Sequence, residues 1–191
     1  DRIFMIPWGS CLYSMQELQD AKPIMKDFSY DLGFVGSFWG NANIGSINNV
    51  NKFLKPLFDY VSPSMIKLAG DGTGKRRVSN EEHKLVLQKS KICPIINSDS
   101  WRAMRGIQDR FWSVFSSGRF GVCDSEGVYE FFNENDVVVE TDPHEYVLKS
   151  IYYMRNPKKQ EKYITNVLKK IKIEYNYYNT WDNILKIVES L

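Results

Sequence analysis

Residues 32–46 read LGFVGSFWGNANIGS, a short apolar run broken by glycines and followed by a loop rich in Gly and Asn. The apolar run, residues 32–38, is typical of a buried strand that ends in a tight turn. Ser46 is a suitable N-cap for a helix to about Tyr60, which Pro56 kinks or shortens. The stretch therefore predicts one strand–helix unit of an α/β fold.

The same alternation continues along the chain. After one helical turn near Ser14–Ala21, we expect further strands at residues 65–69, 91–96, 119–123 and 136–140. We expect helices at residues 79–90, 107–117, 125–132, 143–155, 158–178 and 181–190. Residues 97–105 are interpreted as a polar loop, and Gly118 as the residue that ends the preceding helix. This order predicts a doubly wound, Rossmann-like α/β fold with a parallel sheet of about five strands and a helical C-terminal tail.

The chain of 191 residues is long enough for one well-packed domain. We divide it into a lead-in or interdomain segment (residues 1–30), a Rossmann-like domain (residues 31–178) and a C-terminal helix (residues 179–191). Because the chain begins at Asp1 without Met, we expect either a domain excised from a longer polypeptide or a processed chain. The apolar side of the last helix is then expected to pack on an absent N-terminal domain.

Charge and cysteine content exclude several classes of protein. The 25 basic residues against 23 acidic ones give +2, which lacks the basic field of a typical nucleic-acid binder. No apolar run approaches the roughly 20 residues that span a bilayer. Three widely spaced cysteines favour a reducing, cytoplasmic setting. With two histidines and no CxxC, the sequence does not favour a metal site.

Ligands of open parallel sheets bind beyond the carboxyl ends of the strands. Gly36 and Ser37 follow the first strand, where backbone N–H groups can approach an anion. Asp71 and Lys75 lie in the Gly-rich loop after the second strand, which also carries Arg76 and Arg77 and can hold a pyrophosphate. The alternatives are a tight strand-to-helix turn at the first loop and a solvated basic loop at the second.

The third loop has the highest density of polar residues. Arg102 and Arg105 lie within it, and Arg110 follows in the first turn of the next helix. An arginine at a helix start opposes the macrodipole, so Arg110 is the best candidate for a phosphate ligand. The alternative is an ion pair between Arg110 and an aspartate that closes the cleft. Trp101 can stack on a base or sugar, or serve in the core or at the surface.

Two carboxylates follow the fourth strand. Asp124 and Glu130 are placed where a carboxylate can accept hydrogen bonds from the diol of a ribose or sugar, although Glu130 can equally lie on a solvated helix face. His83 and His144 are interpreted as surface residues. The spacing of the residues yields no Ser-His-Asp or Cys-His arrangement, so no catalytic residue is assigned.

The order of several short motifs resembles one family. The C-terminal half of GT-B glycosyltransferases of group 1, especially the CgeB-like branch, is similar to this chain in motifs at residues 6–9, 30–37, 66–72, 109–112, 117–124, 127–132 and 152–157. The resemblance implies a donor-binding domain for a nucleotide-diphosphate sugar, with UDP the expected nucleotide and a glycan or other hydroxyl group as acceptor. It implies no metal and no tightly bound cofactor.

The resemblance also assigns residues. Gly36 and Ser37 would lie near the donor phosphates, Arg110 would hold the diphosphate, and Glu130 would contact the sugar or ribose. One departure stands out, because the family commonly has Glu at the position of Ser113 and at that of Arg105. A non-catalytic module that binds carbohydrate or a partner chain is therefore the alternative function. An RNA-binding domain that uses residues 75–77 and 169–172 is a third and weaker reading, because the net charge is near zero.

Overall fold

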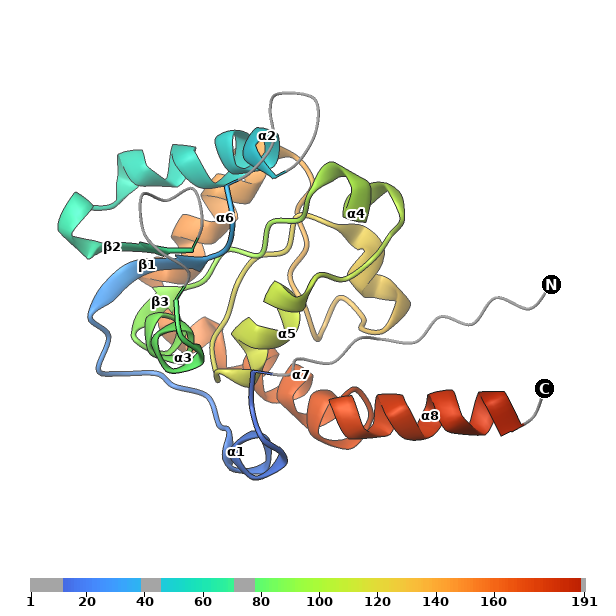
Figure 1. Cartoon of the computed structure of the whole chain (residues 1–191). Coiled ribbons are helices and arrows are strands. Elements are labelled where there is room, and N and C mark those ends of the chain that lie inside the picture. Colours follow the sequence, from blue (N-terminus) through green and yellow to red (C-terminus); the bar gives the residue numbers. More distant parts are fainter. Residues whose placement is uncertain (1–11, 39–45, 71–77, 190–191) are drawn as a thin grey trace.

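The computed structural model describes residues 12–38, 46–70 and 78–189. Its sheet consists of the parallel strands β1 (Tyr30–Val35), β2 (Ile66–Ala69) and β3 (Ser90–Ile92), in the order β2-β1-β3 (Figure 1). Leu32 at the centre pairs with Ile66 on one side and with Ile92 on the other. Leu32 is fully buried, as expected for a central strand covered on both faces.

The prediction of five strands is wrong in part, because the sheet has three. The segments expected as the fourth and fifth strands add isolated parallel bridges, Ile95 to Cys123 and Cys123 to Val139. Pro94 supplies the physical reason for the short β3, because its nitrogen carries no hydrogen and cannot continue the ladder with β1. The chain then runs on beside β3 in the expected order, joined by single hydrogen bonds such as Ile95 N–H to the Val122 carbonyl (3.1 Å).

Residues 46–65 depart from the single helix that the sequence predicts. They form α2 (Ile47–Asn49), a π-helical segment η1 (Val50–Leu54) and the 3₁₀ segments η2 (Lys55–Tyr60) and η3 (Pro63–Met65). Pro56 cannot donate an α-helical hydrogen bond, which accounts for the change of helix type at Lys55. The Ser46 hydroxyl does not cap the helix and instead donates to the Ser37 carbonyl (2.5 Å).

The other helices follow the expected order closely. They are α1 (Met15–Asp20), α3 (Asn80–Gln88), α4 (Asp99–Ala103), α5 (Asp109–Ser116), the 3₁₀ segment η4 (Glu126–Glu130), α6 (Pro143–Arg155), the 3₁₀ segment η5 (Pro157–Lys159), α7 (Glu161–Ile173) and α8 (Tyr177–Glu189). Helix α4 lies where we expected only a polar loop. Helix α3 packs against β1 and β2, and α6 against β3 and η1; in Figure 1, α3 lies below the strands and α6 passes behind them.

The lead-in segment packs on the body of the domain. Leu12 and Leu18 are buried in the same core as the strands. The Ile24 N–H donates to the Gly118 carbonyl (3.0 Å), and the buried Arg119 donates to the carbonyls of Ile24 and Lys91. Arg119 thus ties the lead-in segment to the chain at the end of β3.

Helix α8, unlike the lead-in segment, leaves most of its apolar side chains exposed. Figure 1 shows it extending away from the body of the molecule. Its apolar side chains Trp181, Leu185 and Val188 remain exposed, the last with 61% of its surface accessible. Within the part of the chain that the structure describes, no helix combines the length and apolar character needed to cross a bilayer.

Candidate functional site

A cavity of about 460 Å³ opens beyond the carboxyl ends of β1 and β3, where the topology predicts a ligand. Its walls come from the end of β1, from Ser46, and from α3, α4 and α5. Its lining residues are Val35, Gly36, Ser37, Ser46, His83, Ser98, Ser100, Trp101, Gln108, Asp109 and Arg110. Three residues that the sequence predicts as ligands, Gly36, Ser37 and Arg110, are therefore brought together.

The absence of a side chain at Gly36 lets the Arg110 guanidinium lie close to the backbone. A Cβ atom at this position would overlap the Arg110 guanidinium, so a larger residue would displace that group. The Gly36 N–H donates to the Ala69 carbonyl (2.9 Å), which holds the ends of β1 and β2 together. Gly70 follows with φ of +114° and leaves no room for a Cβ atom beside the Gly36 carbonyl.

Arg110 lies half-buried at the base of the cavity. Its Nε donates to the Val35 carbonyl (3.1 Å), its Nη1 donates to the Ile96 carbonyl, and its guanidinium stacks on the Phe34 ring at 4.4 Å from the centroid. Burial lowers the pKa of Arg110, while the negative charges of Asp124 and Asp109 raise it. The side chain therefore fixes a positive charge between the end of β1 and the segment that follows β3.

One nitrogen of Arg110 is left for a ligand. In the described ranges no residue accepts a hydrogen bond from Nη2, and no carboxylate forms an ion pair with Arg110 within 4.0 Å. The alternative that an Arg110–aspartate ion pair closes the cleft is therefore wrong for the described chain. Backbone carbonyls hold the guanidinium instead, and they do not neutralise its charge.

His83 and Asp109 add two titratable groups to the cavity. The sequence predicts His83 as a surface residue, but it is half-buried and lines the wall. Burial lowers the pKa of His83, Asp109 raises it and Arg110 lowers it, so the three groups interact electrostatically. Asp109 Oδ2 accepts a hydrogen bond from the Ser113 hydroxyl (2.9 Å), which orients the carboxylate. Sequence reasoning gave neither residue a role as a ligand, and it missed Gln108.

Asp124 lies beneath the cavity and does not line it. The side chain is fully buried, and Oδ1 accepts hydrogen bonds from the backbone N–H of Asn97 (3.0 Å) and from its Nδ2 (2.6 Å). Arg102 Nη1 is 4.0 Å from Oδ2. Burial raises the pKa of Asp124 to about 6, against the lowering effect of Asn97, Arg102 and Arg110. Asp124 therefore anchors the loop before α4, and Arg102 lies over the Phe53 ring at 5.2 Å.

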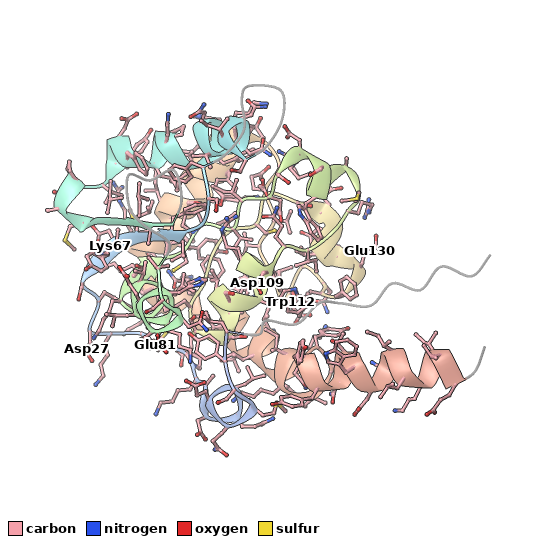
Figure 2. The ribbon with its side chains drawn as sticks, viewed as in Figure 1. Asp27, Lys67, Glu81, Asp109, Trp112 and Glu130 are labelled. Carbon is pink, nitrogen blue, oxygen red and sulfur yellow. The ribbon has the colours of Figure 1, made fainter. Side chains whose placement is uncertain are left out.

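Arg105 and Glu130 pair with each other at the surface, outside the cavity lining. Arg105 Nε donates to Glu130 Oε1 (3.0 Å), and Figure 2 shows Glu130 at the edge of the molecule, apart from Asp109. Arg105 adopts φ of +53°, and the next residue, Gly106, donates its N–H to the Trp101 carbonyl (2.9 Å). Trp101, which lines the cavity and is 41% exposed, is thus hydrogen-bonded to the turn that carries Arg105.

Two predicted residues, Asp71 and Lys75, lie outside the described residues, as do Arg76, Arg77 and the motif at residues 6–9. Ser113, at the position where the resemblance implies a glutamate, is fully buried within α5. Among the described residues no group of three or more His, Cys, Asp or Glu side chains is arranged to hold a metal ion.

Comparison with known protein families gives one match. A family model described as glycosyl transferase-like matches residues 28–186, which is most of the chain. The match includes every described residue that the sequence predicts as a ligand. Comparisons with curated proteins and with solved structures gave no match.

Proposed function

Since the chain belongs to the glycosyl transferase-like family, we propose that it is the donor-binding domain of a GT-B glycosyltransferase of the CgeB-like branch. The donor is a nucleotide-diphosphate sugar, with UDP as the expected nucleotide. The observation that carries the proposal is the Gly36–Arg110 contact, which places a positive charge at the strand ends inside a 460 Å³ cavity.

The diphosphate is the part of the donor that this cavity suits best. Arg110 Nη2 offers a charge-assisted donor, and Ser37 brings its hydroxyl group to the same wall. A preorganised cation stabilises the charge that develops on the leaving diphosphate when the bond at the anomeric carbon breaks. Its strand-carbonyl partners hold Arg110 in place, so little reorganisation is needed.

The ribose hydroxyls are assigned to Asp109. Ser113 is buried and cannot take the role of the family's glutamate, whereas the Asp109 carboxylate lines the cavity one helical turn earlier. Its Oδ1 has no hydrogen-bond partner among the described residues. A carboxylate oxygen in that position can accept a hydrogen bond from a diol.

Trp101 offers an exposed ring for the base or the sugar. The Arg105–Glu130 pair lies next to it, and we assign these two charged side chains to the hydroxyl groups of the sugar. The acceptor and the catalytic base are assigned to an N-terminal domain or a partner chain, with the exposed apolar residues of α8 as the surface that packs on it.

Calorimetric titration with UDP, GDP, ADP and dTDP tests this function. We expect one nucleotide to bind the wild-type chain, with at least about tenfold weaker binding to Arg110→Lys, because lysine lacks the planar fork that reaches two carbonyls and a phosphate. The control is Lys52→Arg, which replaces one cationic side chain by another at an exposed position on η1. If every nucleotide fails to bind, or if Arg110→Lys binds as tightly as wild type, the donor site is wrongly assigned and a binding module becomes the better description.

A further inference from the structure

A second cavity, of about 550 Å³, lies between α6, α7 and the segment at Val137–Val139, and it shares no residue with the cavity at Arg110. Four of its ten lining residues are tyrosines from three separate elements, and the four are Tyr129, Tyr152, Tyr153 and Tyr163. Tyr129 and Tyr152 are 38% and 48% exposed. The wall thus combines aromatic rings with phenolic hydroxyl groups.

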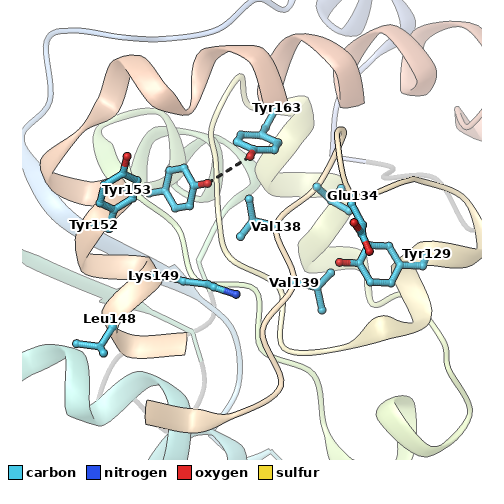
Figure 3. Close-up of a pocket in the computed structure, with 10 residues that line it drawn as sticks. Tyr129, Glu134, Val138, Val139, Leu148, Lys149, Tyr152, Tyr153 and Tyr163 are labelled. Atoms are coloured by element: carbon cyan, nitrogen blue, oxygen red, sulfur yellow. Dashed lines mark hydrogen bonds between the residues drawn. The ribbon is translucent and has the colours of Figure 1, made fainter. Parts of the chain in front are cut away.

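The polar groups of this cavity are held in place. The Tyr153 hydroxyl donates to the Tyr163 hydroxyl (3.3 Å), drawn as a dashed line in Figure 3. Lys149 Nζ forms an ion pair with Glu140 (2.5 Å), and Figure 3 shows the Lys149 side chain extending from α6 toward Val139. Glu134 lies beside Tyr129 at the opposite wall.

A third cavity, of about 410 Å³, adjoins the second across the same aromatic wall. It shares Tyr152, Tyr153 and Tyr163, and its remaining lining residues are Lys158, Lys159 and Lys162. These three lysines are exposed, and none of them has an ion-pair partner in the part of the chain that the structure describes. Lys162 Nζ lies over the Tyr163 ring at 4.7 Å, which keeps this cation close to the aromatic wall.

We propose that these two adjoining cavities form a binding site for an anionic saccharide, distinct from the donor site. Tyrosine faces pack against the C–H surface of sugar rings, while phenolic hydroxyls, Glu134 and the Lys149–Glu140 pair match sugar hydroxyl groups. The three unpaired lysines on the far side of the tyrosines fit carboxylate or other anionic substituents.

Residues 152–157 form one of the motifs that carry the family resemblance. Two tyrosines of this motif, Tyr152 and Tyr153, lie at the centre of the proposed site. Tyr153 packs its ring on the buried Phe120 at 4.7 Å between centroids, so it is fixed from inside the core. Tyr152, its neighbour, is exposed. One tyrosine therefore anchors the wall, and the other presents its ring to a ligand.

Calorimetric titration with tri-galacturonate tests the proposal, with uncharged maltotriose and inorganic phosphate as the other probes. We expect tri-galacturonate to bind wild type at least about tenfold more tightly than either probe, because only it presents both rings and charges. Lys158→Gln/Lys159→Gln/Lys162→Gln should weaken that binding about tenfold or more. Lys26→Gln/Lys52→Gln/Lys55→Gln removes the same charge from exposed positions elsewhere and should leave it unchanged.

A second pair of variants separates the aromatic wall from charge alone. Tyr152→Ala should weaken tri-galacturonate binding, whereas Tyr60→Ala, at an equally exposed tyrosine on η2, should not. Absence of tri-galacturonate binding to wild type overturns the proposal. So does equal loss in both lysine triples, or binding of phosphate as tight as that of the saccharide. Nucleotide binding by the lysine variants, measured in parallel, reports separately on the donor site.

Discussion

A Cβ atom on Gly36 would overlap Nη2 of Arg110, the guanidinium nitrogen that the described strand carbonyls leave without a partner. The glycine is therefore required by the arginine, and the arginine is held by the carbonyls of Val35, at the end of β1, and of Ile96, four residues beyond the end of β3. We expect Gly36→Ala to displace the guanidinium at a cost of about 1–3 kcal/mol in unfolding free energy, as for overpacked sites.

The same substitution should weaken nucleotide diphosphate binding at least about tenfold. Urea unfolding and calorimetry on one preparation measure the two effects together. A Gly36→Ala protein that remains folded and binds nucleotide as tightly as wild type contradicts the assigned position of the diphosphate.

Asp124 predicts a pH dependence of stability. Its pKa is raised from 3.8 to about 6 by burial, so the folded protein keeps this proton to higher pH than the unfolded chain does. The resulting stabilisation is present below about pH 4 and is lost as the pH rises through about 6. Asp124→Asn retains an oxygen that can accept from Asn97 and has no charge to bury.

We therefore expect the unfolding free energy of wild type, relative to Asp124→Asn, to fall between pH 4 and pH 6 and then to level off. Urea unfolding of both proteins at a series of pH values measures the difference. Parallel curves across that range would show that Asp124 titrates normally.

Asp109 should recognise the ribose hydroxyls. Wild type is expected to prefer UDP over 2′,3′-dideoxy-UDP, and Asp109→Asn should reduce that preference, because an amide is a weaker acceptor than a carboxylate. Asp59→Asn, at an exposed carboxylate on η2, is the control. An undiminished preference in the Asp109 variant rules out the proposed contact.

Gly118 is required where α5 ends. It adopts φ of +67°, and a Cβ atom there would overlap the Lys22 carbonyl. Gly118→Ala should lose at least about 1–2 kcal/mol from the left-handed backbone alone. Thermal or urea unfolding measures the loss, and Gly118→Asn should also be destabilised, because its Cβ atom meets the same backbone carbonyl. Equal stability of all three proteins would contradict the close packing of the lead-in segment.

Much of the fold follows from local sequence. The positions of β1, β2, α5 and α6 are confirmed because glycines, caps and apolar runs lie next to one another in the chain. The number of strands is wrong because it depends on which backbone groups meet across the sheet. Pro94 ends the ladder between β3 and β1. The apolar pattern within residues 119–123 or 136–140 does not show which segment lies beside it, or how many hydrogen bonds the two segments form.

The site divides in the same way. Gly36, Ser37 and Arg110 could be predicted because each follows a strand or opens a helix. His83 was missed because its helix reads as amphipathic, and only the packing of α3 on β1 and β2 shows that the ring lines the cavity. Asp124 was expected to contact a ligand because it follows a predicted strand. The sequence does not show how deeply a side chain is buried, and Asp124 is fully buried and does not line the cavity.

His83 offers the most direct measurement of the central claim. Burial lowers its pKa below the ordinary 6.5, and the ring lines the same cavity as Arg110, where we place the diphosphate. A bound diphosphate adds negative charge and should raise that pKa, while the exposed His144 serves as an internal control. An NMR titration of both imidazole rings with and without saturating UDP, or the nucleotide that the panel selects, makes the comparison. We predict an upward shift for His83 alone; equal pKa values for His83 with and without bound nucleotide would contradict the account.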